Sequence, residues 1–185
     1  MGAPDANDKS GSGATHDGTG AGYDMTINVN PSFGTEILSG LNIFVGGHQT
    51  ENYNQTQGLN NAYQGIGGVT FDIGPVSLGA AASGISTGKT VTKTDPDYYK
   101  NTMYGVAFNV NDNLSVSYNE HESEVHFVSP DQNEAIYMEV ESWQVAYTMG
   151  GASVRLAKAE TSNGSYQTAD AFDKEATVIS VSLAF

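Results

Sequence analysis

The chain has 185 residues and a formal net charge of −14, from 21 acidic and 7 basic side chains, and it contains no cysteine. This composition excludes a disulfide framework and thiolate metal sites, and it makes nucleic acid an unsuitable partner because phosphate binding needs clustered Lys and Arg. No run of about 18 apolar residues predicts a transmembrane helix, and the first residues lack the basic and apolar regions of a signal peptide.

The leading segment, residues 1–22, is rich in Gly, Ser, Thr, Ala and Asp and has little to bury, so we expect a flexible external loop or tail. From Tyr23 onward, apolar and polar residues alternate with a period of two, which predicts strands with unlike faces. Nine such segments follow, and none predicts a helix. Their alternating series begin at Tyr23, Leu41, Tyr63, Val76, Thr102, Leu114, Trp143, Ala152 and Thr177.

The predicted connections alternate in length. Short turns at 31–36, 74–75, 111–113 and 150–151 are separated by long polar loops near 49–61, 87–99, 122–139 and 160–174. An up-and-down barrel of an outer membrane has short turns on one rim and long loops on the other, whereas a β-sandwich mixes connection lengths. The sequence therefore predicts an all-β fold, an antiparallel up-and-down transmembrane β-barrel, with about nine of its strands in residues 23–185.

Charge placement leads to the same prediction. We expect the acidic residues in the leading segment, the long loops and their shoulders, with no carboxylate and only one cation, Arg155, in the middle of a strand. A lipid-facing Arg or Lys at mid-bilayer costs roughly 2–4 kcal/mol, so a membrane barrel excludes such charges. Aromatic residues also end the apolar series at two heights, like interfacial girdles. These are Tyr23, Tyr63, Tyr104, Tyr118 and Trp143 at one end, and Phe71, Phe108, Tyr147 and Phe185 at the other.

The last segment carries a further indication. Its apolar series Ile179, Val181, Leu183 and Phe185 resembles the C-terminal signature of Gram-negative outer-membrane barrels, which the barrel-insertion machinery reads. Residues 71–79 and 150–154 are similar to periplasmic hairpins of the Gram-negative general porin family, in its alphaproteobacterial, Rhodobacter-like branch. The resemblance covers about residues 23–185. It implies a homotrimer of 16-stranded barrels in the bacterial outer membrane, in contact with lipid and lipopolysaccharide.

The resemblance also implies where the nine segments belong. Both ends of the family's barrel lie on the periplasmic side, so the segments would be its eighth to sixteenth strands. We therefore expect a C-terminal fragment, whose signal peptide and inward-folding constriction loop belong to the missing half. Nine antiparallel strands cannot close with both ends on one side, since single-chain bacterial barrels have even strand numbers.

Arg155, the only arginine, has the phase of the polar series. In the porin family, basic residues on the wall face acids of the constriction loop, so the resemblance implies a wall residue of this kind. The alternative is a charge that a wet lumen tolerates without any effect on solutes. The same phase predicts five further pore-lining residues: Asn42, Gln64, Asn109, Asn119 and Gln144.

The outward phase continues beyond the upper aromatic residues into five acids: Glu120, Glu122, Glu124, Glu139 and Glu141. If Leu114 lies opposite Met149, Glu122 faces Glu141 and Glu124 faces Glu139, and like charges directly opposed are destabilising. Carboxylate clusters bind hard divalent cations, so we expect Ca²⁺ or Mg²⁺ here, bridging to lipopolysaccharide phosphates or a neighbouring subunit. The alternative is ordinary solvated charge.

The expected function is therefore passive diffusion of small hydrophilic solutes and ions through a water-filled channel that requires no cofactor. We expect no enzyme, because the sequence contains no nucleophile elbow, phosphate loop or zinc-ligand spacing. The main alternative is a secreted β-sandwich, a binding or adhesin-like domain with acidic loops. An outer-membrane enzyme or a small closed anchor barrel is a third possibility.

Overall fold

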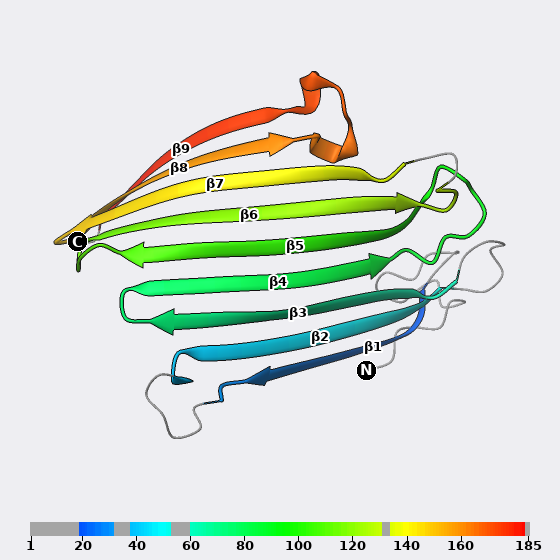
Figure 1. The fold of residues 1–185 in the computed structure, drawn as a ribbon, viewed down its shortest axis with the longest axis horizontal. Coiled ribbons are helices and arrows are strands. Elements are labelled where there is room, and N and C mark those ends of the chain that lie inside the picture. Colours follow the sequence, from blue (N-terminus) through cyan, green and yellow to red (C-terminus); the bar gives the residue numbers. More distant parts are fainter. Residues whose placement is uncertain (1–18, 32–37, 53–59, 131–133, 184–185) are drawn as a thin grey trace.

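The computed structural model describes residues 19–31, 38–52, 60–130 and 134–183. These residues form one nine-stranded sheet in which every strand pairs antiparallel with its neighbour in sequence (Figure 1). Two three-residue 3₁₀ helices, η2 (Gly164–Tyr166) and η3 (Asp170–Phe172), lie between the last two strands. The strands are β1 (Thr19–Val29), β2 (Leu41–Asn52), β3 (Ala62–Ile73), β4 (Val76–Ser86), β5 (Pro96–Asn109), β6 (Leu114–Phe127), β7 (Ile136–Met149), β8 (Ala152–Ser162) and β9 (Lys174–Leu183).

The prediction of nine antiparallel up-and-down strands is confirmed. The sheet is open, with β1 and β9 as its two edges, so the structure holds a curved sheet and not a closed barrel. No helix of the described residues is long and apolar enough to cross a bilayer. The predicted leading segment overlaps β1, which begins at Thr19, and residues 1–18 lie outside the described ranges.

At one end of the sheet three connections are short, at 74–75, 110–113 and 150–151. At the same end β1 and β2 are separated by residues 30–40, which is longer than the short turn predicted at 31–36, and residues 32–37 lie outside the described ranges. The connections at the other end are long, but shorter than predicted. At the short-turn end, Gly74 and Gly150 adopt positive φ values of 57° and 58°, which glycine tolerates and tight turns require. At the other end the strands continue past their apolar series, so that β6 runs to Phe127 and β7 begins at Ile136. The predicted loop at 122–139 was therefore wrong, because backbone pairing persists where the apolar series has ended.

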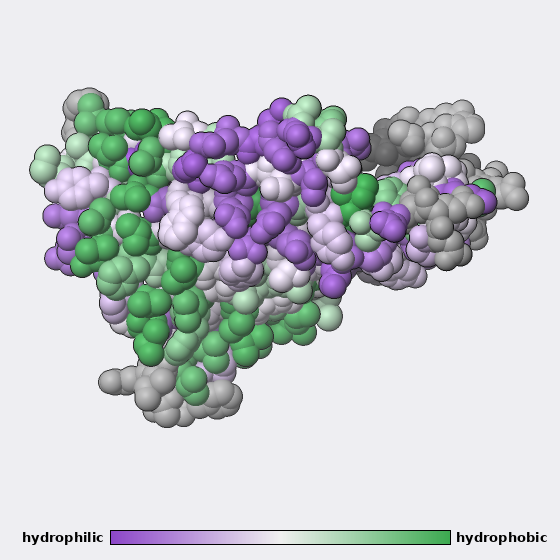
Figure 2. All heavy atoms as spheres, turned by 45° about the horizontal axis from the view of Figure 1, so that its top comes forward, coloured by the Kyte–Doolittle hydropathy of each residue, from purple (hydrophilic) through white to green (hydrophobic). Residues whose placement is uncertain are grey.

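The register gives the sheet two unlike faces, since cross-strand partners share a face. One face, called the apolar face below, carries most of the exposed large hydrophobic side chains, such as Trp143 at 61% and Ile179 at 68% exposure. Among the described residues, Val125 is the only buried hydrophobic side chain. The apolar face is thus bare. Figure 2 shows hydrophobic residues gathered toward the short-turn end and hydrophilic residues toward the long-loop end.

The strand register is staggered along the sheet. Starting at Ile73, beside the β3–β4 turn, successive cross-strand partners are Val76, Phe108, Val116 and Val145. The β7–β8 turn follows Met149, which is four residues beyond Val145. The short turns are therefore displaced by four residues over four strand-to-strand steps, which means that the strands are tilted relative to the line of turns.

Candidate functional site

The face opposite the apolar one, called the polar face below, carries all six side chains that the sequence predicted to share a phase. Asn42 pairs with Thr70, Gln64 with Ile85, Asn119 with Gly105 and Ser142, and Arg155 with Ala146 and Ser180. Asn109 pairs with Ser115, and Gln144 pairs with Ser117 and Ala157. Their common face follows from this register, and their role as pore-lining residues stays a prediction.

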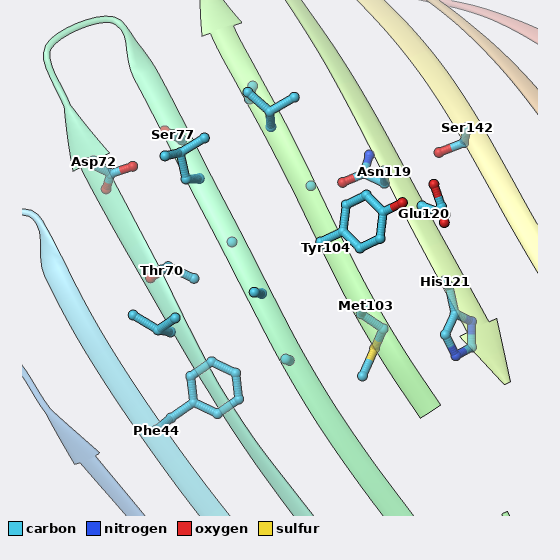
Figure 3. A pocket seen from close by; sticks show the side chains of 18 of the residues that line it. Phe44, Thr70, Asp72, Ser77, Met103, Tyr104, Asn119, Glu120, His121 and Ser142 are labelled. Carbon is cyan, nitrogen blue, oxygen red and sulfur yellow. The ribbon is translucent and has the colours of Figure 1, made fainter. Parts of the chain in front are cut away.

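The polar face contains an open groove of about 620 Å³ across β2 to β7. Phe44, Met103 and His121 belong to one cross-strand row that passes through Gly68 and Ala81 (Figure 3). The row nearer the short turns adds Thr70, Asn119 and Ser142, and the next adds Asp72 and Ser77. The groove therefore offers amide, hydroxyl, imidazole and carboxylate groups above a mainly small-residue floor.

Glycine makes this groove possible at two positions. A Cβ atom on Gly68 would lie 2.5 Å from Cζ of Phe44, and one on Gly105 would lie 2.4 Å from Oδ1 of Asn119. The Phe44 ring and the Asn119 amide thus lie directly over glycine backbone. Any larger residue at 68 or 105 would displace these side chains.

Arg155 lies on the polar face of β8 and is exposed. It is the only Arg or Lys in the middle of a strand on that face within the described residues, but the prediction of a single mid-strand cation was wrong, because Lys158 lies in the middle of β8 on the apolar face. Lys174, which shares the face, begins β9 at the long-loop end. The arrangement places a single guanidinium in a cross-strand row with Ser and Ala partners.

The predicted register of β6 and β7 was wrong by two residues. Leu114 pairs with Tyr147 and not with Met149. Consequently Glu120 faces Glu141, Glu122 faces Glu139, and Glu124 faces Tyr137. A shift of two residues keeps every side chain on its predicted face, because the side-chain period of a strand is two.

The expectation that strand interiors hold no carboxylate was also wrong. Glu120 lies midway along β6, and one cross-strand row joins Glu120, Glu141, Glu160 and Glu175 on β6 to β9. The neighbouring row, closer to the long loops, pairs Glu122 with Glu139. These acids end the apolar face of β6 to β9, and are called the acidic rows below.

Three carboxylates of the acidic rows converge. Glu120, Glu139 and Glu141 each place one oxygen within 4.8 Å of the others. The hydroxyl of Tyr118 donates a hydrogen bond of 2.8 Å to Oε2 of Glu120. This geometry suits a hard divalent cation such as Ca²⁺ or Mg²⁺, although solvated acids adopt it as well, and the cation stays a prediction.

Glu120 and Glu139 lie beyond the apolar series of their strands, and their pKa values are shifted in opposite directions. Hydrogen bonds from Tyr104 and Tyr118 lower the pKa of Glu120. Burial raises the pKa of Glu139, and the charges of Glu120, Glu141 and Glu122 raise it further. The cluster therefore concentrates negative charge, which favours the protonated form of Glu139.

Basic side chains lie on either side of this cluster. Lys158 contacts Glu160 at 2.6 Å and Glu175 at 3.3 Å, and Lys100 lies 3.8 Å from Glu124. Nε2 of His126 lies 2.8 Å from Oε1 of the same Glu124. In the part of the chain that the structure describes, no Lys or Arg forms an ion pair with Glu120, Glu139 or Glu141.

One polar network was missed by the sequence reasoning. The Ser123 hydroxyl lies 2.6 Å from the Tyr166 hydroxyl and donates to Oδ1 of Asn101 at 2.5 Å, while Nδ2 of Asn101 donates to the Ser83 hydroxyl at 3.0 Å. The network joins three strands to the β8–β9 connection. No periodic pattern signals such a contact, because Tyr166 lies in a connection, 43 residues from Ser123.

The predicted C-terminal signature lies partly within the structure. Ile179, Val181 and Leu183 occupy the apolar face of β9, and Phe185 is outside the described residues. In comparisons with models of known protein families and with curated proteins, the chain matches none.

Proposed function

We propose that this chain forms part of a porin-like β-barrel of the bacterial outer membrane, through which small hydrophilic solutes and ions diffuse passively. In this proposal the apolar face contacts lipid, and the polar face, with Arg155, Asn42, Gln64, Asn109, Asn119 and Gln144, lines a water-filled lumen. Lipopolysaccharide contacts the acidic rows, the barrel-insertion machinery recognises the C-terminal strand, and the assembled protein is a homotrimer.

The observation that carries the proposal is the bare apolar face. Within the described ranges, twenty-four large hydrophobic side chains with substantial exposure lie on it, from Tyr23 on β1 to Leu183 on β9. Each fully buried side chain of this size contributes about 1.5–3 kcal/mol, so a sheet that leaves them all in water forgoes the main source of folding free energy. Hydrocarbon would cover this face without any second protein layer.

The stagger of the register supports a barrel. One residue of displacement per strand, with a rise of ~3.3 Å per residue and a strand spacing of ~4.8 Å, tilts the strands by about 35° from the perpendicular to the line of turns. Transmembrane barrels have strand tilts of about 35–45°. A β-sandwich would instead place a second sheet on the apolar face, and all nine described strands belong to one sheet.

Closure needs more than these nine strands. β1 and β9 run in the same direction, so joining them would create a parallel pair in an otherwise antiparallel sheet. We propose that further strands pair with both edges and complete an even number. Their pairing would also remove the two exposed edges, which otherwise favour aggregation.

The test is to isolate the native assembly from membranes in mild detergent and add it to planar lipid bilayers. We expect it to fractionate with the outer membrane and to produce stepwise, ohmic conductance increases without an energy source. Liposome swelling should show entry of small sugars and exclusion of large ones. A protein that stays soluble and monodisperse without detergent would refute the proposal.

A further inference from the structure

The buried side chains of the described residues gather at one place. Ser123 and Val125, each 2% exposed, lie two residues apart on the polar face of β6 at its long-loop end, and Glu124 lies between them on the other face. Tyr99, the cross-strand partner of Val125, stands 5.4 Å from Tyr166, ring centre to ring centre. The most buried point of the sheet therefore coincides with a contact from the β8–β9 connection.

That contact crosses a strand. Tyr166 belongs to η2, which follows β8, yet its side chain reaches Ser123 on β6 and Tyr99 on β5. β7 lies between β8 and β6, and neighbouring strands lie about 4.8 Å apart. Ser123 and Tyr99 are both on the polar face, so the connection folds over that face and not away from the sheet.

The hydrogen bonds give Tyr166 a defined role. Ser123 has a single hydroxyl hydrogen, which it donates to Oδ1 of Asn101, so the Tyr166 hydroxyl must be the donor in its contact with Ser123. Asn101 in turn donates to Ser83 on β4. Tyr166 thus completes a chain of hydrogen bonds across β4, β5 and β6.

The connection is held in an unusual backbone conformation. Asn163, Ser165 and Tyr166 have φ values of 52°, 58° and 57°, a region that non-glycine residues adopt rarely and keep only where surrounding contacts hold them. Asn163 supplies two such contacts, its backbone N–H donating to Asp173 at 2.8 Å and its Nδ2 to the Tyr137 carbonyl at 2.8 Å. The inward fold of the connection is therefore built by several independent contacts.

We propose that the β8–β9 connection is a fixed inward-folded element that narrows the long-loop mouth of the channel, with Tyr166 as the residue that fastens it to the wall. This inference rests on the proposed function for its effect on solutes, whereas the position of the connection can be tested without any channel activity. Tyr166 is a positioning residue, whose hydroxyl contacts Ser123 and whose ring contacts Tyr99. By holding the connection over the polar face, it restricts the size of the solutes that enter.

The position is tested by cross-linking, for which the absence of native cysteine is an advantage. In the native assembly, the pair Ser123→Cys with Tyr166→Cys should react with a short bis-thiol reagent. The matched control pair is Glu122→Cys with Tyr166→Cys, because Glu122 neighbours Ser123 and faces the opposite side of the sheet. Preferential cross-linking of the Glu122 pair would overturn the inference.

The effect is tested by single-channel conductance and liposome swelling. Tyr166→Ala should raise conductance by roughly 1.5-fold and admit larger sugars, because pore cross-section limits both, and Tyr166→Phe should give a smaller rise. Gln167→Ala, an exposed change in the same connection, should match wild type. Unchanged conductance in Tyr166→Ala, with the Ser123 pair cross-linked, would overturn the narrowing. Wild-type protein without any conductance would instead refute the proposed function, whatever the cross-links show.

Discussion

The two faces of this sheet differ in a way that reverses the usual order of a protein in water. On β5 the apolar-face residues Tyr104, Val106 and Phe108 are exposed, while Asn101 and Met103 on the polar face are half-buried. The polar face also carries the groove and the contact of Tyr166. Under the proposed function the apolar face contacts lipid, which is an apolar medium, whereas water would favour the opposite arrangement of the two faces.

The acidic rows limit how far the apolar face extends along its strands. On β3 the apolar face carries no charged side chain from Ile73 to Tyr63, whereas on β6 it reaches only from Leu114 to Tyr118 before Glu120. The tilt accounts for part of this difference, since a cross-strand row is inclined to the line of turns. The charge-free part of the apolar face therefore ends at different points along β3 and β6.

The largest expected effect comes from placing one charge on each face at adjacent positions. Val69 and Thr70 are neighbours on β3, on the apolar and polar face respectively. Val69→Arg should lower the free energy of unfolding in phospholipid vesicles by about 2–4 kcal/mol, because a guanidinium would enter hydrocarbon. Thr70→Arg should change it by less than about 1 kcal/mol. Urea titration of vesicle-embedded assembly measures both, and equal losses would contradict the assignment of the faces.

The next effect concerns the acidic rows. If Ca²⁺ binds Glu120, Glu139 and Glu141, removing it with a chelator should destabilise the assembly by up to about 2.7 kcal/mol, for an ion initially present at 100 times its Kd. The measurement is the thermal midpoint with and without chelator. Glu120→Gln with Glu141→Gln should abolish the difference. Glu160→Gln, whose carboxylate contacts Lys158, is the control and should retain it.

A chelator-insensitive wild type would leave the acidic rows as ordinary solvated charge. The acidic rows would then mark where the apolar face ends and water begins, without a bound metal.

The face assignment could be predicted from the sequence because it depends only on a period of two. Alternation alone places Ile43, Val45 and Val69 on one face, without knowledge of their cross-strand partners. Strand ends could not be predicted in this way, since β6 and β7 stay paired through Val125 and Ile136, where apolar and acidic residues mix. Backbone hydrogen bonds, which the alternation does not report, decide where a strand ends.

The register and the polar network were beyond the same reasoning for different reasons. The pairing of Leu114 with Tyr147 cannot be predicted from alternation, because a shift of two residues preserves the alternation. The contact of Tyr166 with Ser123 depends on how one connection folds back over β7. Neither the β6–β7 register nor this contact produces a pattern in the order of neighbouring residues.

A smaller effect is expected on the polar face. A unit charge about 8 Å from the path of an ion changes its energy by roughly 0.5 kcal/mol in water, which is about a twofold change in relative permeability. Arg155→Ala should therefore shift selectivity toward cations by about that factor, measured as a reversal potential in planar bilayers. Lys158→Ala removes a charge from the opposite face of the same strand and is the control. An equal shift in both variants would mean that Arg155 has no special position.

The smallest expected effect concerns Glu139, whose pKa is raised by burial and by the charges of Glu120, Glu141 and Glu122. A raised pKa means that the folded state favours the protonated carboxyl, so wild type loses stability as the pH rises from the unfolded value of 4.5 through the folded value. Glu139→Gln lacks this loss. With chelator present, to exclude bound cations, the variant should be more stable than wild type at pH 8, and the two should be equally stable well below pH 4.5.

The difference between the two proteins is the informative quantity, because Glu120, whose pKa is lowered and whose contribution has the opposite sign, is present in both. Thermal midpoints of vesicle-embedded wild type and Glu139→Gln, followed from pH 4 to pH 8, give that difference directly. A gain that is the same at every pH would mean that the amide improves packing and that charge is irrelevant. A gain in stability that appears only at alkaline pH would mean that ionised Glu139 is repelled by the neighbouring carboxylates of the acidic rows. The folded protein would then carry a destabilising charge where the apolar face of β7 ends.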